Sequence, residues 1–362
     1  MLYYVLGIVM VVLFASANIR YGKHTIQDKK KENLTIEKFA LFVMFAFYVF
    51  LFTFESVNSN TDLQAYRDAY LSFQYVFDGD YLSIIRDNKD PVYYIVSFFF
   101  YRLGLGFYGW HAIIGLFYSY ALYDLIKRYS SNVYISFIVS ISLGSLAFAL
   151  SALRQILAIS FVIFAFRYIV EKRPIKFIAL TLIASLFHST AIIFLIAYLL
   201  YWIKLKIKKL IVMAIFMIIA IPVAKPLVAF ILPRIGAHEL YYEYLQSETS
   251  LQISGTIISA SILVFCVVCM LLNKKEAKYQ GLCNFAMLSI FFRVLSVVFF
   301  AEMFRFSLYF SIFDIILIAE ACSCGVAKDR TIIKIKTLLA TLALTAYYFI
   351  SPATNIVDYV FK

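Results

Sequence analysis

Apolar runs of about 14 to 20 residues recur along the whole sequence, and only short polar segments separate them. Since about 20 apolar residues cross the hydrocarbon core of a bilayer, this pattern predicts a polytopic membrane protein. Of the 362 residues, 63% are hydrophobic and 15% are charged, whereas a soluble domain has about 25% charged residues. Backbone polar groups in lipid need internal partners, and the alternation of a β-barrel is absent, so we expect an all-α fold. We treat residues 1–362 as one membrane domain.

Short clusters of basic residues between the apolar runs set the expected topology. About two thirds of the 33 Lys and Arg residues fall in six such clusters, which is typical of cytoplasmic loops. A net charge of +12 arranged in this way indicates membrane loops rather than a nucleic-acid partner. Changing sides from one cluster to the next predicts about twelve transmembrane helices, with both termini outside: 1–19, 39–54, 110–126, 133–150, 155–170, 175–188, 190–203, 209–224, 253–272, 282–300, 304–321 and 334–350.

Two longer polar segments are expected on the external face. The first, 55–109, begins with an acidic stretch and includes "PVYYIVSFFFYRLGLGF" (91–107). This apolar stretch is short and begins at a proline, and a full crossing would move every later basic cluster outside. We therefore interpret it as a re-entrant or interfacial helix. The second segment, 225–252, is rich in tyrosine, whose rings suit the headgroup level and could equally stack on sugars.

A set of polar side chains falls at or near the external ends of these spans. Each has an ordinary explanation, since an Arg near a span end often extends to the lipid phosphates and a His at a helix end often packs or caps. Their coincidence at one depth predicts a site. Arginines suit a pyrophosphate, because a guanidinium group binds two phosphate oxygens and stays charged. The residues are Asp62, Tyr66, Asp90, Arg154, His188, Arg293, Glu302 and Arg305.

The stretch "LSALRQILAISFVIFAFRYIVEKRPIKFIALTLIASLFHSTAIIFLIAYLL" (150–200) resembles the core signature of the EpsG family of polysaccharide polymerases. These polymerases are related in role to the Wzy polymerases of O-antigen and capsule. The resemblance consists of Leu-Arg-Gln followed by Ala on one helix, a basic turn, and a short helix that ends in Phe-His-Ser. Three weaker elements agree: "NTDLQAYRDAY" (60–70), "DPVYYIV" (90–96), which has Asp where the family commonly has Glu, and "MFRFSLYF" (303–310).

The resemblance implies an enzyme, a membrane glycosyltransferase of GT-C-like architecture. Such a polymerase joins undecaprenyl-pyrophosphate-linked oligosaccharide repeat units into an O-antigen, a capsule or another exopolysaccharide. It implies the bacterial cytoplasmic membrane, an active site that faces the periplasm or the exterior, and a flippase and a chain-length regulator as partners. The acidic residues are scattered, so we predict no metal site and no cofactor.

The residues divide into three expected roles. Three arginines are expected to bind the donor pyrophosphate and to stabilise the charge on the leaving phosphate: Arg154, Arg293 and Arg305. The base that takes the acceptor proton has three candidates, and a reaction without a protein base also stays open; the candidates are His188, Asp62 and Glu302. Four residues are expected to hold a sugar or to position other groups: Gln155, Tyr66, Asp90 and Tyr309.

The alternative function is a flippase or transporter for the same lipid-linked oligosaccharide. A flippase needs charge along a central path that can be reached from both sides of the membrane. Here nearly all of the embedded charge falls in the external third of the expected topology. The distribution of charge therefore favours the polymerase.

Overall fold

The structure, a computed structural model, describes residues 26–76, 90–143, 145–204, 250–273, 280–298 and 303–323, with single residues and short runs between 206 and 230. Every regular element that these residues form is a helix, which confirms the all-α prediction for the described part of the chain. The chain forms two compact units, of which unit 1 holds Met1–Ile192 and Thr341–Lys362, and unit 2 holds Ile193–Ala340. The single membrane domain over 1–362 stays a prediction.

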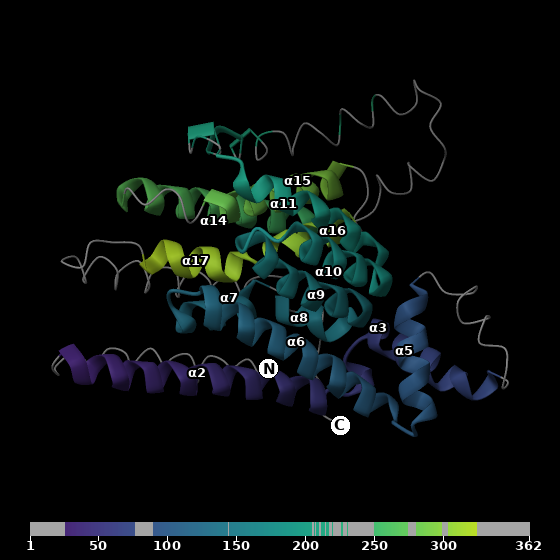
Figure 1. Cartoon of the computed structure of the whole chain (residues 1–362). Coiled ribbons are helices and arrows are strands. Elements are labelled where there is room, and N and C mark those ends of the chain that lie inside the picture. The colour runs from purple at the N-terminus through teal and green to yellow at the C-terminus, as the bar shows by residue number, and fades with distance from the viewer. Residues whose placement is uncertain are drawn as a thin grey trace. The chain divides into compact units, whose positions relative to one another are not determined.

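The described part of unit 1 is a set of packed helices (Figure 1). In it α2 packs along α6, α6 packs along α9, and α9 pairs with α10, while α5 contacts α3, α6 and α10. The elements are α2 (Ile26–Phe54), η1 (Val57–Ser59), α3 (Thr61–Leu71), η2 (Ser72–Tyr75), α5 (Pro91–Arg102), α6 (Phe107–Tyr129), α7 (Val133–Ser142), α8 (Ser145–Ser151), α9 (Leu153–Val170) and α10 (Pro174–Phe187).

A glycine allows α2 and α6 to approach closely. A Cβ atom on Gly115 of α6 would overlap the side chain of Phe52 on α2. Tyr48 of α2 and Tyr118 of α6 fill the same interface, with ring centroids 6.3 Å apart, and both are almost completely buried. The Tyr48 hydroxyl donates to Ser140 Oγ of α7 at 2.8 Å, so the buried polar group has a partner.

Helices α9 and α10 form a hairpin with a tight basic turn. Lys172 lies in the left-handed region, with φ of 55°. The N–H groups of Arg173 and Lys172 donate back to the carbonyls of Tyr168 at 2.8 Å and Ile169 at 3.1 Å, which ends α9. Pro174 then begins α10. The chain reverses at this turn, and so the first turn of α9 and the last turn of α10 lie at the opposite end of the hairpin.

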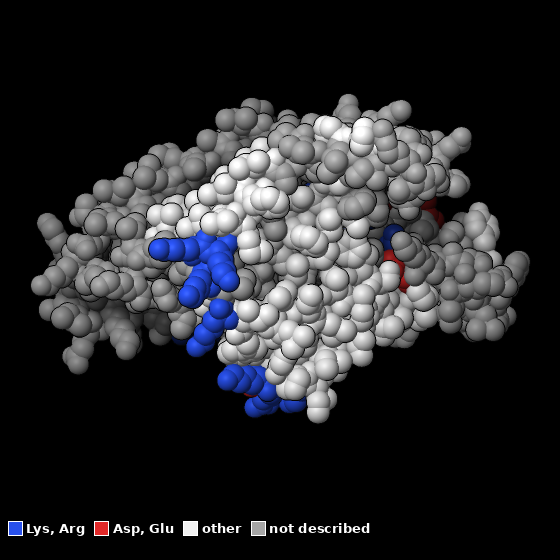
Figure 2. Space-filling view, turned by 90° about the horizontal axis from the view of Figure 1, so that it is seen from above, with Lys and Arg blue, Asp and Glu red and all other residues white. Residues whose placement is uncertain are grey.

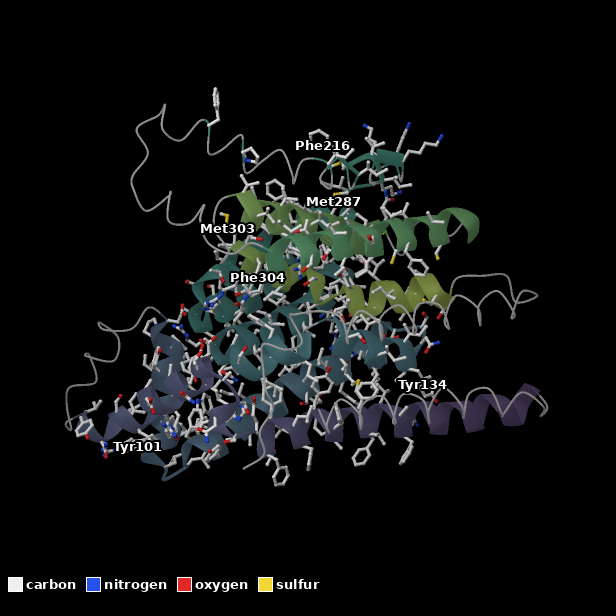
Figure 3. The ribbon with its side chains drawn as sticks, turned by 180° about the vertical axis from the view of Figure 1, so that it is seen from behind. Tyr101, Tyr134, Phe216, Met287, Met303 and Phe304 are labelled. Atoms are coloured by element: carbon white, nitrogen blue, oxygen red, sulfur yellow. The ribbon has the colours of Figure 1, made fainter. Side chains whose placement is uncertain are left out.

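Helix α5 corresponds to the expected re-entrant or interfacial helix. Its 12 residues span about 18 Å, which is less than the thickness of the bilayer core of about 30 Å. It ends where Gly104 adopts a φ of +78° and Leu105 N–H donates back to the Phe100 carbonyl at 3.1 Å. Tyr101, labelled in Figure 3, contacts the rings of Tyr70 and Phe73 from the preceding segment. The place of this segment relative to a membrane stays a prediction.

Unit 2 packs around α15, which contacts α11, α14, α16 and α17. Its elements are α11 (Ile196–Trp202), α14 (Ser250–Asn273), α15 (Gln280–Val298), α16 (Phe304–Ser311) and α17 (Asp314–Ser323), and η3 (Ser189–Leu195) contains the boundary between the units. The ring of Phe285 lies 5.9 Å from that of Phe194, 6.0 Å from that of Phe310 and 5.4 Å from that of Phe313. An aromatic core therefore holds this unit together.

The described helices agree with some of the expected membrane spans and divide others. Two of them, α9 and α15, are long and apolar enough to cross a membrane, and α16 with α17, bent by 46°, would make a third. The expected span 133–150 is divided into α7 and α8, and 190–203 begins as the 3₁₀ helix η3. The expected spans 1–19 and 334–350 lie outside the described residues, as do most of 209–224 and of the second external segment 225–252. The count of about twelve and the GT-C-like architecture stay predictions.

The surface also suits a membrane-embedded protein. Figure 2 shows a described surface that is mostly uncharged, with Lys and Arg gathered in separate clusters. Helix α10 exposes a run of large apolar side chains, a kind of surface that marks contact with lipid or with another protein. These side chains are Ile175, Ile178, Leu182, Ile183 and Leu186.

Candidate active site

Asp90 is the centre of a buried polar cluster in unit 1. Its side chain is 1% exposed, and three donors reach its two carboxylate oxygens. Oδ2 accepts from Arg154 Nη1 at 3.0 Å and lies 2.9 Å from His188 Nδ1, while Oδ1 accepts from the backbone N–H of Ser189 at 3.0 Å. Asp90 therefore joins α9 to the residues that follow α10, across 64 to 99 positions of sequence.

The Asp-Pro sequence explains why this carboxylate is available. Pro91 begins α5, and a proline keeps the preceding residue out of the helical region. Asp90 accordingly has φ of −121° and ψ of 73° and lies just before the helix. Its side chain makes no capping hydrogen bond to α5. Both oxygens can therefore accept from other elements.

His188 lies where α10 ends. Its backbone is extended, with φ of −153° and ψ of 110°, so the helix stops at Phe187. The following residue, Ser189, begins η3 with its N–H directed at Asp90. The imidazole is largely buried, and in the described part of the chain its Nε2 atom has no hydrogen-bond partner. One ring nitrogen is therefore held by Asp90, and the other has a free bonding position.

Arg154 lies in the first turn of α9. A cation is unfavourable there, because the N-terminus of a helix carries partial positive charge. Besides Asp90, its Nε donates to the Tyr66 hydroxyl of α3 at 3.3 Å. The guanidinium carbon lies 5.8 Å from the ring centre of Tyr66 and 5.9 Å from that of Tyr94. The side chain is 24% exposed, so these contacts fix the guanidinium group but leave part of it accessible.

The cluster keeps Asp90 ionised. Burial alone would raise the pKa of the Asp90 carboxyl, but the hydrogen bonds from His188 and Ser189, the positive charge of a protonated His188 and the charge of Arg154 outweigh burial. The pKa therefore lies below its ordinary value. At neutral pH the group is a carboxylate, which can only accept hydrogen bonds.

The structure brings four of the predicted site residues together in unit 1: Tyr66, Asp90, Arg154 and His188. Gln155 is the next residue of α9 and is buried. Asp62 lies in the first turn of α3 and is exposed, and it makes none of the contacts described above. Glu302 lies outside the described residues.

The other predicted residues belong to unit 2: Arg293, Arg305 and Tyr309. Arg293 lies on α15 against the backbone of α14, where a Cβ atom on Gly255 would come 2.6 Å from Arg293 Nη1. It also interacts electrostatically with Asp314, the first residue of α17. Arg305 lies in the first turn of α16, and Tyr309 of the same helix is completely buried. Their proposed roles toward a substrate stay predictions.

Three features of unit 1 were not predicted from the sequence: Tyr94, Ser189 and a second pair of a carboxylate and a histidine. Tyr94 and Ser189 lie within the quoted stretches "DPVYYIV" and "SLFHST", so their neighbours could have indicated them. The second pair is formed by Glu55, which follows α2, and His111 of α6. Both side chains are completely buried, with His111 Nε2 3.5 Å from Glu55 Oε2.

The second pair lies among aromatic rings, and its carboxyl group differs in charge from that of Asp90. The ring centres of Phe52 and Phe107 lie 5.4 and 6.1 Å from that of His111. Neither oxygen of Glu55 has a hydrogen-bond partner in the described part of the chain. Burial raises the pKa of the Glu55 carboxyl to about 9. Near pH 7 Glu55 is therefore a neutral acid, and the two residues do not form an ion pair.

Comparison with known proteins confirms the resemblance that the sequence suggested. The model of the EpsG family matches residues 38–361, which is nearly the whole chain. No curated protein and no solved structure matches the chain.

Proposed function

Because the chain belongs to the EpsG family of Wzy-like polysaccharide polymerases, we propose that it joins oligosaccharide repeat units carried on undecaprenyl pyrophosphate. The growing glycan leaves its lipid carrier, and its anomeric carbon forms a bond to a hydroxyl oxygen of the incoming unit. The transfer takes place at the outer face of the bacterial cytoplasmic membrane. The product is a polysaccharide such as an O-antigen, a capsule or another exopolysaccharide.

The observation that carries this proposal is the arrangement of Arg154. Its Nη1 and Nε atoms are held by Asp90 and Tyr66, while Nη2 has no hydrogen-bond partner among the described residues. The guanidinium group is thus oriented in advance, and part of it is accessible. The N-terminus of α9 adds partial positive charge at the same place. A phosphate oxygen would find both a fixed cation and a free N–H donor there.

This arrangement supports the chemistry of a lipid-pyrophosphate leaving group. As the bond between the anomeric carbon and the phosphate oxygen breaks, its electron pair stays on the pyrophosphate. A cation that is already fixed in position stabilises this charge in the transition state more than in the ground state. Arg293 and Arg305 of unit 2 are proposed as further phosphate ligands. Gln155 and Tyr309 are proposed to position the sugar or the ligands around it.

The hairpin of α9 and α10 supports the outer face as the place of reaction. The basic turn, with Arg167, Lys172 and Arg173, has the composition of a cytoplasmic loop. Arg154 lies 13 residues before Arg167 on one helix, a distance of about 20 Å along its axis. His188 lies at the same end of the hairpin as Arg154. If the turn is cytoplasmic, both residues are near the opposite leaflet.

The central experiment replaces the guanidinium group. Arg154→Lys keeps the charge but removes the planar donor pair, and we expect the rate of transfer to fall about 10²–10³-fold. The measurements are glycan length on gels at matched protein level, and turnover of lipid-linked repeat units by the purified full chain. Arg167→Lys on the same helix is the matched control, because Arg167 lies at the exposed turn, where it donates to Glu171. Long glycans at normal yield in the Arg154→Lys strain would contradict the proposal.

Labelling of single cysteines tests the proposed side of the membrane. Ala152→Cys, just before α9, should react with an impermeant thiol reagent added outside, whereas Ile175→Cys beside the basic turn should not. The described native cysteines, Cys266, Cys269, Cys283 and Cys322, are buried, and Cys324, which lies outside the described residues, is replaced by Ser in the background for labelling. Labelling near Arg154 from the cytoplasmic side in some state would favour a flippase instead.

A further inference from the structure

We infer that Asp90 is a positioning residue that holds His188 in the tautomer whose Nε2 atom takes the proton of the acceptor hydroxyl. The inference rests on the proposed function, because it assigns the base of the same transfer. It selects His188 in preference to Asp62 among the candidates that the sequence left open; Glu302 lies outside the described residues, and Glu302→Gln is therefore measured beside the variants below.

The hydrogen bonds around Asp90 determine the tautomer. An ionised carboxylate has no proton to donate, so the hydrogen between Asp90 Oδ2 and His188 Nδ1, which are 2.9 Å apart, belongs to Nδ1. In a neutral imidazole the lone pair then lies on Nε2. This atom is buried and has no partner within the described residues. A buried acceptor without a donor is unfavourable, and an acceptor hydroxyl would supply the missing donor.

Neither carboxylate near this site is suited to the role of base. Asp90 already accepts from three donors, which stabilise its anion and make it a weak acceptor of a further proton. Asp62 is exposed in the first turn of α3, where the helix dipole stabilises its negative charge. His188 therefore remains the group with a free and oriented lone pair.

The transfer is balanced with these groups. The acceptor hydroxyl gives its proton to His188 Nε2, and its oxygen forms the new bond to the anomeric carbon of the donor. The bond from that carbon to the pyrophosphate oxygen breaks, and its electron pair stays on the pyrophosphate beside Arg154. His188 becomes an imidazolium cation that the Asp90 carboxylate stabilises. The proton then leaves to solvent or to the released phosphate.

Asp90 contacts both His188 and Arg154. The test therefore has to separate an effect of Asp90 on the tautomer of His188 from an effect on the position of Arg154. We compare Asp90→Asn, His188→Ala and the double variant in the purified full chain with lipid-linked repeat units. Each single change is expected to lower turnover about 10²–10⁴-fold. In the His188→Ala background, Asp90→Asn is expected to cost at least about 10-fold less than in the wild-type background, because its effect through His188 is already lost and only its contact with Arg154 remains. Asp68→Asn, an exposed carboxylate of α3, is the matched control.

If Asp90→Asn lowers turnover by the same factor in both backgrounds, the inference is overturned, because Asp90 would then act through Arg154 or by itself and not through His188. Turnover that survives in His188→Ala but is lost in Asp62→Asn would overturn it as well. Yield and thermal stability of each variant are measured beside turnover, so that loss of folded protein is not counted as loss of rate.

A spectroscopic measurement on the unchanged protein does not depend on how the variants fold. The chain has four histidines, so ¹⁵N-histidine labelling gives few signals, and comparison with His188→Gln assigns those of His188. We expect Nδ1 to carry the hydrogen and Nε2 to be unprotonated in the neutral ring. A neutral ring with the hydrogen on Nε2 would overturn the inference. Failure of the proposed function would appear differently, as wild-type protein that does not extend lipid-linked units at all.

Discussion

Unit 1 contains two pairs of a carboxylate and a histidine, and the two pairs are opposite in character. Asp90 accepts hydrogen bonds from three directions, lies beside Arg154 and keeps its charge. Glu55 lies 3.5 Å from His111 among aromatic rings, and burial raises its pKa to about 9. Both carboxyl groups are almost completely inaccessible to solvent. The number of donors around each carboxyl group, rather than its burial, decides whether it is charged.

The contrast separates a chemical site from a structural contact. At the first pair one nitrogen of His188 is fixed and the other is free, next to a partly exposed guanidinium group. At the second pair both residues are enclosed at the α2–α6 interface. Burial and a carboxylate neighbour would select both histidines as candidates, whereas the hydrogen bonds select only His188. Substitutions in and around the two pairs test this contrast.

The largest difference is expected between the two histidines. His188→Gln removes the proposed base, and we expect transfer to slow about 10²–10⁴-fold at unchanged yield. His111→Gln is expected to lower thermal stability but to leave the rate per folded molecule within about 3-fold, because a structural residue acts through the amount of folded protein. Turnover of the two purified proteins gives the comparison. Equal loss of rate in both variants would remove the distinction between the pairs.

Gly115→Ala should loosen the helix contact that encloses the second pair. The added methyl group would overlap the side chain of Phe52, and overpacking of this kind costs about 1–3 kcal/mol. Thermal unfolding of the full chain in detergent measures the loss. Gly106→Ala is the matched control, because nothing lies within 4 Å of a Cβ atom built there. Equal melting temperatures for the two variants would show that α2 and α6 do not meet as described.

The two carboxyl groups should respond to pH with opposite signs. The Glu55 carboxyl has a pKa of about 9 when folded and its ordinary value, near 4.5, when unfolded, so folding takes up a proton between these pH values. Its contribution to stability therefore falls as pH rises from about 4.5 to about 9. Glu55→Gln needs no proton, and its melting temperature relative to wild type should rise steadily from pH 5 to pH 9.

Asp90 provides the reverse case. Its pKa is lowered in the folded protein, so its contribution is present above the pKa of the unfolded state and disappears as pH falls through the folded value. Asp90→Asn should therefore destabilise the protein at neutral pH, and the difference from wild type should shrink in acid. The same melting series measures both variants. If Asp90→Asn raises the melting temperature at pH 7, the charge of Asp90 destabilises the fold, as that of Glu55 is expected to do, and the contrast between the two carboxyl groups is wrong.

The smallest effect is expected at Tyr66. Tyr66→Phe keeps the ring beside Arg154 and removes the 3.3 Å hydrogen bond to its Nε. One such bond is worth about 0.5–1.5 kcal/mol, so we expect the KM for the lipid-linked donor to rise by about 2- to 10-fold. Tyr75→Phe in η2 is the control, since Tyr75 is 73% exposed. An unchanged KM in Tyr66→Phe would mean that Asp90 alone orients the guanidinium group.

The sequence was a good guide where charge interrupts an apolar pattern. Arg154 and His188 stand out because they lie at the ends of apolar helices, and the structure places them at the first turn of α9 and the end of α10. The all-α fold follows from the same pattern. Breaks inside apolar stretches were missed. Gly144 is the one signal between α7 and α8 in an otherwise apolar run, and the residues between α16 and α17, Ile312 and Phe313, are as apolar as the helices on either side.

The partners of each polar residue could not be predicted. Asp90 was a candidate for holding a sugar or positioning other groups, but its role as common acceptor depends on contacts across 64 and 98 residues. Glu55 looked like the beginning of an external polar loop, and its burial is a result of how α2 packs on α6. Patterns of hydropathy report which residues are polar, whereas the charge of a buried group depends on its neighbours in space.

The hairpin of α9 and α10 also has a consequence for the order of assembly. Arg154 and His188 are brought to the same end by a turn that is complete within a few residues, and contacts close in sequence form early and at little entropic cost. Asp90 comes from a segment that is synthesised earlier, and its contacts with α9 and with the end of α10 span 64 to 99 residues. We therefore expect Arg154 and His188 to be brought together before Asp90 joins them. A nascent chain would carry the parts of the site without its reactivity until unit 1 has closed.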